Sequence, residues 1–175
     1  MALVDNTLWW LALPVAASVI AIIFAFGLRR WVLANDTGTP AMRKVSDAIY
    51  KGAQAFLSRQ YRTIAILALI SAVVIGAVLA IIANYQHSTD PWWVVGIRTG
   101  LSFLFGAFCS GLAGYIGMQV AVRANIRVAS AAQRGLGDAL MVSLRGGAVS
   151  GFLVISLSLL GVTVLYLIVL ALGTS

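Results

Sequence analysis

Four long runs of apolar residues alternate along the chain with shorter segments that carry almost all of its charges. The runs cover residues 8–28, 63–85, 99–122 and 146–172. Each is as long as the roughly 20 residues that a helix needs to cross a bilayer, and none alternates like a membrane β-strand. The pattern therefore predicts an all-α fold, a polytopic membrane protein with four transmembrane helices in this chain.

The polar segments between these runs also carry helical signals. Thr39 and Pro40 read as an N-cap followed by proline at the first helical position, and apolar residues then recur every three or four positions as far as Tyr61. This spacing predicts an amphipathic helix that continues directly into the second run. Residues 124–134 predict a similar extension of the third run, and Arg134 with Asp138 has i,i+4 spacing.

The distribution of basic residues predicts the orientation of the chain in the membrane. Segment 29–62 holds seven Lys or Arg and segment 123–145 holds four, whereas the rest of the chain holds only Arg98. Because cytoplasmic loops collect Lys and Arg, we expect these two segments in the cytoplasm and the N-terminus outside it. The expected location is the cell (inner) membrane. The segments expected outside are 1–7, 86–98 and 173–175.

Four of the basic residues flank the apolar runs directly or closely. Long cationic side chains at such positions reach the membrane–water boundary while their stems stay in apolar surroundings. We therefore expect cytoplasmic interface anchors at Arg59, Arg62, Arg123 and Arg145.

Composition narrows the class further. Of 175 residues, 61% are hydrophobic and 10% charged, which excludes a soluble or disordered chain. The net charge of +7 follows from the topological bias, so no nucleic-acid partner is expected. The chain has one cysteine (Cys109), one histidine (His87), five Asp and no Glu. A single cysteine cannot form an intrachain disulfide, and this set of residues does not suit a metal site with several ligands. With no Asp, Glu, Lys or His inside a run, we predict no catalytic, substrate-binding or metal-binding residue in this chain.

Small residues form stripes on the third and fourth runs. Lipid gives helices no hydrophobic reason to associate, so close approach at small residues must supply the attraction. We therefore predict helix-packing positions at Gly106, Ser110, Gly111, Gly114, Gly117, Gly146, Gly147 and Gly151.

Three segments in order resemble the N-terminal region of one protein family. They read AIYKGAQAFLSRQYRTIAILA, then FLFGAFCSGLAGYIGMQVAVRANIRVASAAQRGLGDAL, then SLRGGAVSGFLVISLSLLG, and the resemblance runs from Met42 to Gly161. The family is that of membrane-bound, ion-pumping inorganic pyrophosphatases.

The resemblance implies a pump of about sixteen helices that hydrolyses pyrophosphate on the cytoplasmic side. It implies that magnesium is required and that hydrolysis drives protons, or sodium ions, out of the cytoplasm. It also implies a homodimer in which an inner ring of helices holds the substrate and the ion gate, and the first four helices belong to an outer ring.

The family's glycine-rich and Asp- and Lys-containing substrate motifs are expected after Ser175, so the chain resembles a fragment, the start of such a pump. We expect this segment to act as an outer-ring scaffold that packs against the remaining helices and membrane lipids. Its magnesium ligands would lie elsewhere, and residues 1–175 alone would be inactive. The alternatives are a stand-alone, non-catalytic four-helix membrane scaffold and a small transporter, the latter without a charged pathway.

Overall fold

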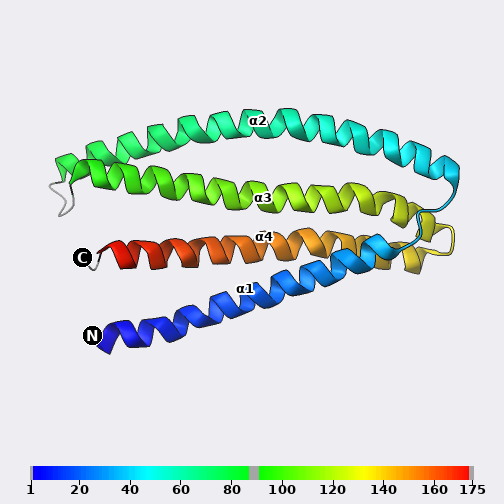
Figure 1. The fold of residues 1–175 in the computed structure, drawn as a ribbon, viewed down its shortest axis with the longest axis horizontal. Coiled ribbons are helices and arrows are strands. Elements are labelled where there is room, and N and C mark those ends of the chain that lie inside the picture. Colours follow the sequence, from blue (N-terminus) through cyan, green and yellow to red (C-terminus); the bar gives the residue numbers. More distant parts are fainter. Residues whose placement is uncertain (1, 87–90, 174–175) are drawn as a thin grey trace.

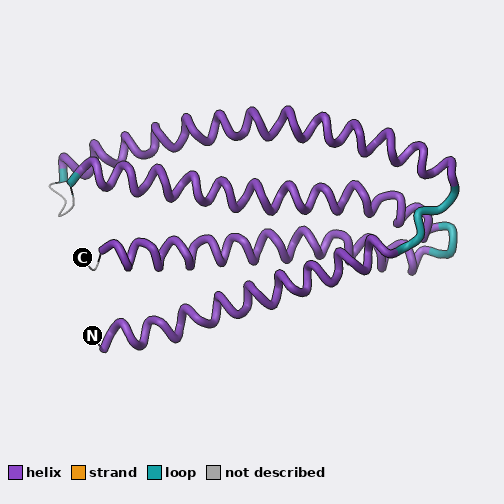
Figure 2. Tube along the Cα trace, viewed as in Figure 1, coloured by secondary structure: helices purple, strands orange, loops and turns teal. Residues whose placement is uncertain are grey.

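The computed structural model describes residues 2–86 and 91–173 and is helical over almost all of them. Four helices follow one another, drawn in Figures 1 and 2: α1 (Ala2–Ala34), α2 (Pro40–Tyr85), α3 (Trp92–Ala132) and α4 (Leu136–Gly173). Each contains a stretch long and apolar enough to cross a membrane. The predicted all-α class with four spanning helices is confirmed. His87 and Ser175 lie outside the described residues.

The helices are longer than the apolar runs, and all extend toward the same end of the bundle. The connections 35–39 and 133–135 lie together at that end, while the N and C termini lie at the other (Figure 1). The 46-residue α2 has the predicted N-cap, since the Met42 amide donates to the hydroxyl of Thr39 and Pro40 follows the cap. The predicted amphipathic helix therefore does continue without a break into the second apolar run.

Helix α3 is the centre of the arrangement. It packs along α2 on one side and along α4 on another, while α1 packs mainly on α4 and touches α3 less extensively. Among the described residues, α1 and α2 make no direct helix–helix contact. The four helices thus form an open layer rather than a closed four-helix bundle, as Figure 1 shows.

Two small core clusters join α1, α3 and α4, and the second of them lies nearer the connections. One contains Ala25, Val120, Val149 and Leu153, and the other contains Val32, Ala124, Ala131 and Val142. Most large apolar side chains elsewhere are exposed, including Phe108 at 66% and Ile155 at 63%. Such exposure would be costly in water but suits a surface that meets lipid or further helices.

Candidate functional site

Helices α3 and α4 approach closely at small residues. A Cβ added at Gly117 would lie 2.8 Å from the Ser150 hydroxyl oxygen and 3.2 Å from the Ser150 Cβ, and one at Gly146 would lie 3.3 Å from the Ala124 Cβ. Because no larger residue fits at Gly117, its hydrogen atoms let the two helix backbones approach closely.

Two further glycines of the α3 stripe face α2 through one tyrosine. The Tyr61 hydroxyl donates a hydrogen bond to the Gly111 carbonyl oxygen at 3.0 Å. A Cβ at Gly114 would lie 3.0 Å from that same hydroxyl. The glycines therefore leave space for the Tyr61 hydroxyl to hydrogen-bond to the α3 backbone. Such internal partners are needed inside a membrane, where water is not available to polar groups.

The remaining predicted packing residues are open within the described chain. Cβ atoms built at Gly106, Gly147 and Gly151 would meet no described atom within 4 Å. Ser110 is exposed and, with Gly106, lines a cavity of about 570 Å³ between α3 and α4. For these four positions the helix-packing role stays a prediction.

Sequence reasoning missed the closest α2–α3 approach. At Gly76 a Cβ would lie 2.8 Å from the Gly96 carbonyl oxygen, and at Gly100 one would lie 3.3 Å from the Ala72 carbonyl oxygen. At Gly96 it would lie 2.9 Å from both the Ala80 Cβ and the Gly76 carbonyl oxygen. The available signal was the four-residue spacing of small residues, Ala72–Gly76–Ala80 on α2 and Gly96–Gly100 on α3.

A polar network centred on Tyr50 joins α2 to α3 near the connections. The Tyr50 hydroxyl accepts hydrogen bonds from Gln54 Nε2 (2.9 Å) and Arg123 NH2 (2.8 Å) and donates one to Gln119 Oε1 (3.1 Å). Gln119 Nε2 in turn donates to the Tyr115 hydroxyl at 3.3 Å. The Arg123 guanidinium also lies 5.1 Å from the centre of the Tyr50 ring, within cation–π range. The predicted anchor Arg123 is therefore built into a helix–helix contact.

Beside this network lies a cavity of about 320 Å³ that α1, α2 and α3 line together. Arg29 of α1 and Arg123 of α3 both face it, and no carboxylate lines it. No pattern in the sequence indicates that these two arginines, which are distant along the chain, line one cavity.

The end of α1 is held by side chains of α3. Arg127 donates from Nε and NH2 to the Leu33 carbonyl oxygen at 3.2 and 2.9 Å. The last carbonyls of a helix lack partners within the helix and carry partial negative charge, so a guanidinium there both satisfies and stabilises them. Burial, with a smaller effect from Arg123, lowers the pKa of Arg127, which still leaves arginine charged at neutral pH.

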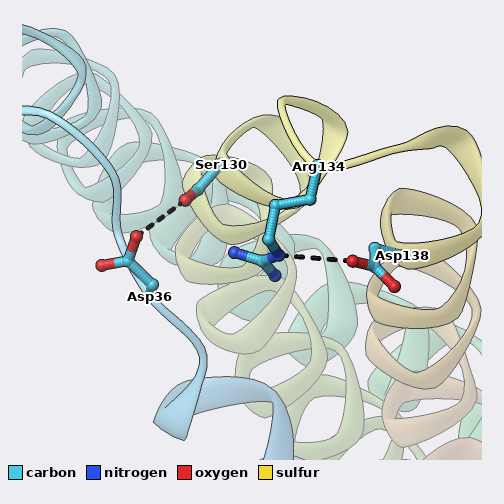
Figure 3. A network of polar contacts seen from close by, with 4 residues as sticks. All are labelled: Asp36, Ser130, Arg134 and Asp138. Carbon is cyan, nitrogen blue, oxygen red and sulfur yellow. Dashed lines mark hydrogen bonds and ion pairs between the residues drawn. The ribbon is translucent and has the colours of Figure 1, made fainter.

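The connection after α1 is fixed by a hydrogen bond from the Ser130 hydroxyl to a carboxylate oxygen of Asp36, 3.0 Å long (Figure 3). This hydrogen bond, then those from the Gly38 and Thr37 amides and the charge of Arg43, lower the pKa of Asp36. Gly38 adopts a φ of +69° in this turn, a conformation that glycine adopts without strain.

Figure 3 also shows the predicted ion pair between Arg134 and Asp138, at 3.3 Å. It spans the turn between α3 and α4 rather than one helix, because α3 ends at Ala132 and α4 begins at Leu136. Both side chains are about half exposed, at 49% and 59%. An exposed pair of this kind contributes little to stability.

The four predicted anchors lie at two levels along the bundle. Arg145 stacks on the Trp31 ring, 3.9 Å from its centre, near the end of α1. The hydrogen bond from Tyr61 to Gly111 places the neighbouring Arg62 at the level of Gly111 on α3. Arg123 lies roughly twelve residues, or about 18 Å, further along α3. Hence Arg59 and Arg62, exposed on α2, are well displaced from Arg123 and Arg145.

Among the described residues, no three His, Cys, Asp or Glu side chains gather in a way that could hold a metal ion. Asp36 and Asp138 are engaged with Ser130 and Arg134. The described residues thus do not fit a magnesium site with several carboxylate ligands.

These features define a class: a multi-pass helical membrane protein segment with helix-packing contacts and a basic cluster at one end. The model of the family described as inorganic H+ pyrophosphatase matches residues 19–174. The chain belongs to this family, as the resemblance indicated.

Curated relatives agree with this membership. The chain is 46% identical over 162 residues to the K(+)-insensitive pyrophosphate-energized proton pump of Caldanaerobacter subterraneus, covering 90% of this chain and 22% of that protein. It is 48% identical over 151 residues to the K(+)-insensitive pyrophosphate-energized proton pump 2 of Moorella thermoacetica, covering 86% and 20%. It is 39% identical over 155 residues to pyrophosphate-energized membrane proton pump 3 of Arabidopsis thaliana, covering 85% and 19%.

The chain therefore spans about a fifth of the length of these relatives. No solved structure matches it.

Proposed function

We propose that this chain forms the first four helices of a pump that couples magnesium-dependent pyrophosphate hydrolysis to proton export. The observation that carries the proposal is the family match over residues 19–174, joined to relatives named as pyrophosphate-energized proton pumps. Within such a pump, these helices would act as an outer-ring scaffold. Pyrophosphate, magnesium and protons would be handled by residues outside this chain, in a homodimer.

The open surfaces of the chain support a scaffold role. The stripe positions Gly106, Gly147 and Gly151 meet no other described residue within 4 Å, although small residues on membrane helices typically mark close contacts. Further helices of the same protein would cover these positions. The orientation that we propose, with both termini outside and the two connections in the cytoplasm, follows from the seven and four basic residues of segments 29–62 and 123–145.

The proposal is tested first by sequencing the reading frame beyond the codon for Ser175. We expect it to continue with glycine-rich and Asp- and Lys-containing motifs. The complete product, expressed in inverted membrane vesicles, should acidify the lumen when pyrophosphate and magnesium are added, as followed by quenching of an acridine dye.

Three controls sharpen this assay. Vesicles that carry only residues 1–175 should neither hydrolyse pyrophosphate nor acidify. Omission of magnesium should abolish both activities of the complete product. A protonophore should collapse the acidification if protons are the pumped ion. A sodium pump would instead accumulate labelled sodium in the lumen in the presence of the protonophore, without acidifying it. A reading frame that stops after Ser175, or a complete product without pyrophosphate-dependent transport, contradicts the proposal.

A further inference from the structure

The cavity beside the Tyr50 network has the chemistry of an anion site. Its lining holds two guanidinium groups, Arg29 and Arg123, together with the hydroxyls of Tyr50 and Tyr115 and the amides of Gln54 and Gln119. A volume of about 320 Å³ lies at the lower end of the range typical of ligand pockets. Guanidinium groups bind phosphate oxygens through paired, charge-assisted hydrogen bonds.

The positive charge of this cavity is not neutralised within the described chain. The lining contains no Asp or Glu, and the one ion pair found among the described side chains, Arg134–Asp138, belongs to the turn between α3 and α4. Arg123 uses one nitrogen on Tyr50. For Arg29 the described structure provides no hydrogen-bond or ion-pair partner, so its donors are available for a bound anion.

The cavity lies between helices that are not packed against each other on all sides. Helices α1 and α2 line it but do not contact each other, and they diverge from the connections toward the termini (Figure 1). Arg29 follows the apolar run 8–28 and Arg123 follows the run 99–122. Both arginines therefore lie where α1 and α3 leave their predicted spans, whereas Tyr50 and Gln54 of α2 lie thirteen and nine residues before the run 63–85 begins. The cavity would thus lie at the headgroup level or on its cytoplasmic side.

An apolar stripe on α3 leads away from the cavity. Leu101, Phe108 and Leu112 precede Tyr115 by fourteen, seven and three residues, so all four share one helix face. They are exposed by 62%, 66%, 38% and 46% respectively. The stripe is roughly 21 Å long at 1.5 Å per residue, enough for an acyl chain that spans about 15 Å of one leaflet.

We propose that this cavity binds the phosphate of an anionic phospholipid from the cytoplasmic leaflet, with an acyl chain along the Leu101–Tyr115 stripe between α1 and α2. Basic pockets between membrane helices on the cytoplasmic side are suited to such headgroups. The exposed apolar stripe is the reason to assign a lipid rather than free phosphate. The choice of leaflet rests on the proposed orientation, whereas lipid binding at this site requires neither pyrophosphate hydrolysis nor ion pumping.

The test compares two neighbouring arginines with the same charge change. Arg29 lines the cavity, whereas Arg30 is exposed and does not line it. The 175-residue chain is purified in mild detergent, delipidated and titrated with dioleoyl phosphatidylglycerol or dioleoyl phosphatidylcholine, and bound lipid is counted by native mass spectrometry. We expect R29Q to weaken phosphatidylglycerol binding about tenfold, the factor for one lost charge-assisted hydrogen bond, and R30Q by about threefold or less.

Further variants separate loss of the site from loss of the fold. R29K, which keeps the charge, should recover part of the affinity, and all variants should keep the far-ultraviolet circular dichroism of the native chain. The lipid assignment is overturned if R29Q and R30Q bind phosphatidylglycerol equally, or if phosphatidylcholine binds as tightly as phosphatidylglycerol. It is also overturned if inorganic phosphate at millimolar concentration displaces the lipid completely, because the site would then bind free phosphate.

Discussion

The close backbone approach of α2 and α3 at Gly76 and Gly96 yields the sharpest prediction. Replacement of Gly96 by alanine puts a methyl group 2.9 Å from the Ala80 Cβ and 2.9 Å from the Gly76 carbonyl oxygen. Real Cβ atoms do not approach other atoms so closely. Since one of the two obstacles is backbone, no rotamer change relieves the contact and the helices must separate by a few tenths of an ångström.

The expected cost follows from this geometry. Forcing an extra methyl group into a filled contact costs about 1–3 kcal/mol. Replacing a helical glycine by alanine gains up to about 1 kcal/mol from intrinsic helix propensity, which hides part of the clash in a single measurement. Gly106 lies on the same helix, and a Cβ there meets no described atom within 4 Å. The difference between G96A and G106A cancels the propensity gain and should equal the clash, about 1–3 kcal/mol.

The assay is reversible unfolding of the chain in mixed micelles by increasing sodium dodecyl sulfate, followed by circular dichroism. G96A should unfold at a clearly lower detergent fraction than the native chain, and G106A at an equal or higher fraction. G76A, which meets the Gly96 carbonyl oxygen at 2.8 Å, should behave like G96A. If G96A and G106A have the same free energy of unfolding, the close α2–α3 packing at Gly96 is refuted.

Three other predictions concern the end of the molecule that holds the connections. R127Q should cost about 1–3 kcal/mol of unfolding free energy because the Leu33 carbonyl at the end of α1 loses both guanidinium donors. R134Q, which removes an exposed pair, should cost less than about 0.5 kcal/mol, and equal losses in the same titration would contradict this. The lowered pKa of Asp36 implies a stabilising contribution that is complete above the ordinary pKa of 3.8 and is lost as the pH falls through the lower pKa of the folded chain. The native chain should therefore lose more stability than D36N in that acid range. Parallel pH profiles of the two chains would refute this. W31L should cost about 0.5–2 kcal/mol through loss of the Arg145 cation–π contact, and a W31L chain no less stable than the native one would argue against that contact.

Several features of the fold were predictable because they depend on local chemistry. The Thr39–Pro40 start of α2, its unbroken length and the four apolar spans follow from capping, periodicity and hydrophobic length, and all were confirmed. The Arg134–Asp138 pair was also predicted from spacing, although it crosses a turn instead of lying along one helix.

The contacts between helices were less predictable. The glycine stripe on α3 includes Gly117, which touches α4, and Gly106, which touches no described residue. The sequence offered the same small-residue signal for both. It gave no reason to join Arg29 to Arg123 or Tyr50 to Gln119, which are distant along the chain and meet only because three helices converge.

Span length, charge bias and motifs are properties of single segments, so a helical membrane protein of the inorganic H+ pyrophosphatase family can be inferred from the sequence alone. The register between the helices, which separates Arg62 from Arg123 along the axis and brings Arg29 and Arg123 to one cavity, emerges only when the helices pack. Lipid is as apolar as the side chains it contacts, so hydrophobicity drives each helix into the bilayer without selecting its neighbour. That choice depends on whether particular surfaces fit, as at Gly76 and Gly96, and on which polar groups find partners.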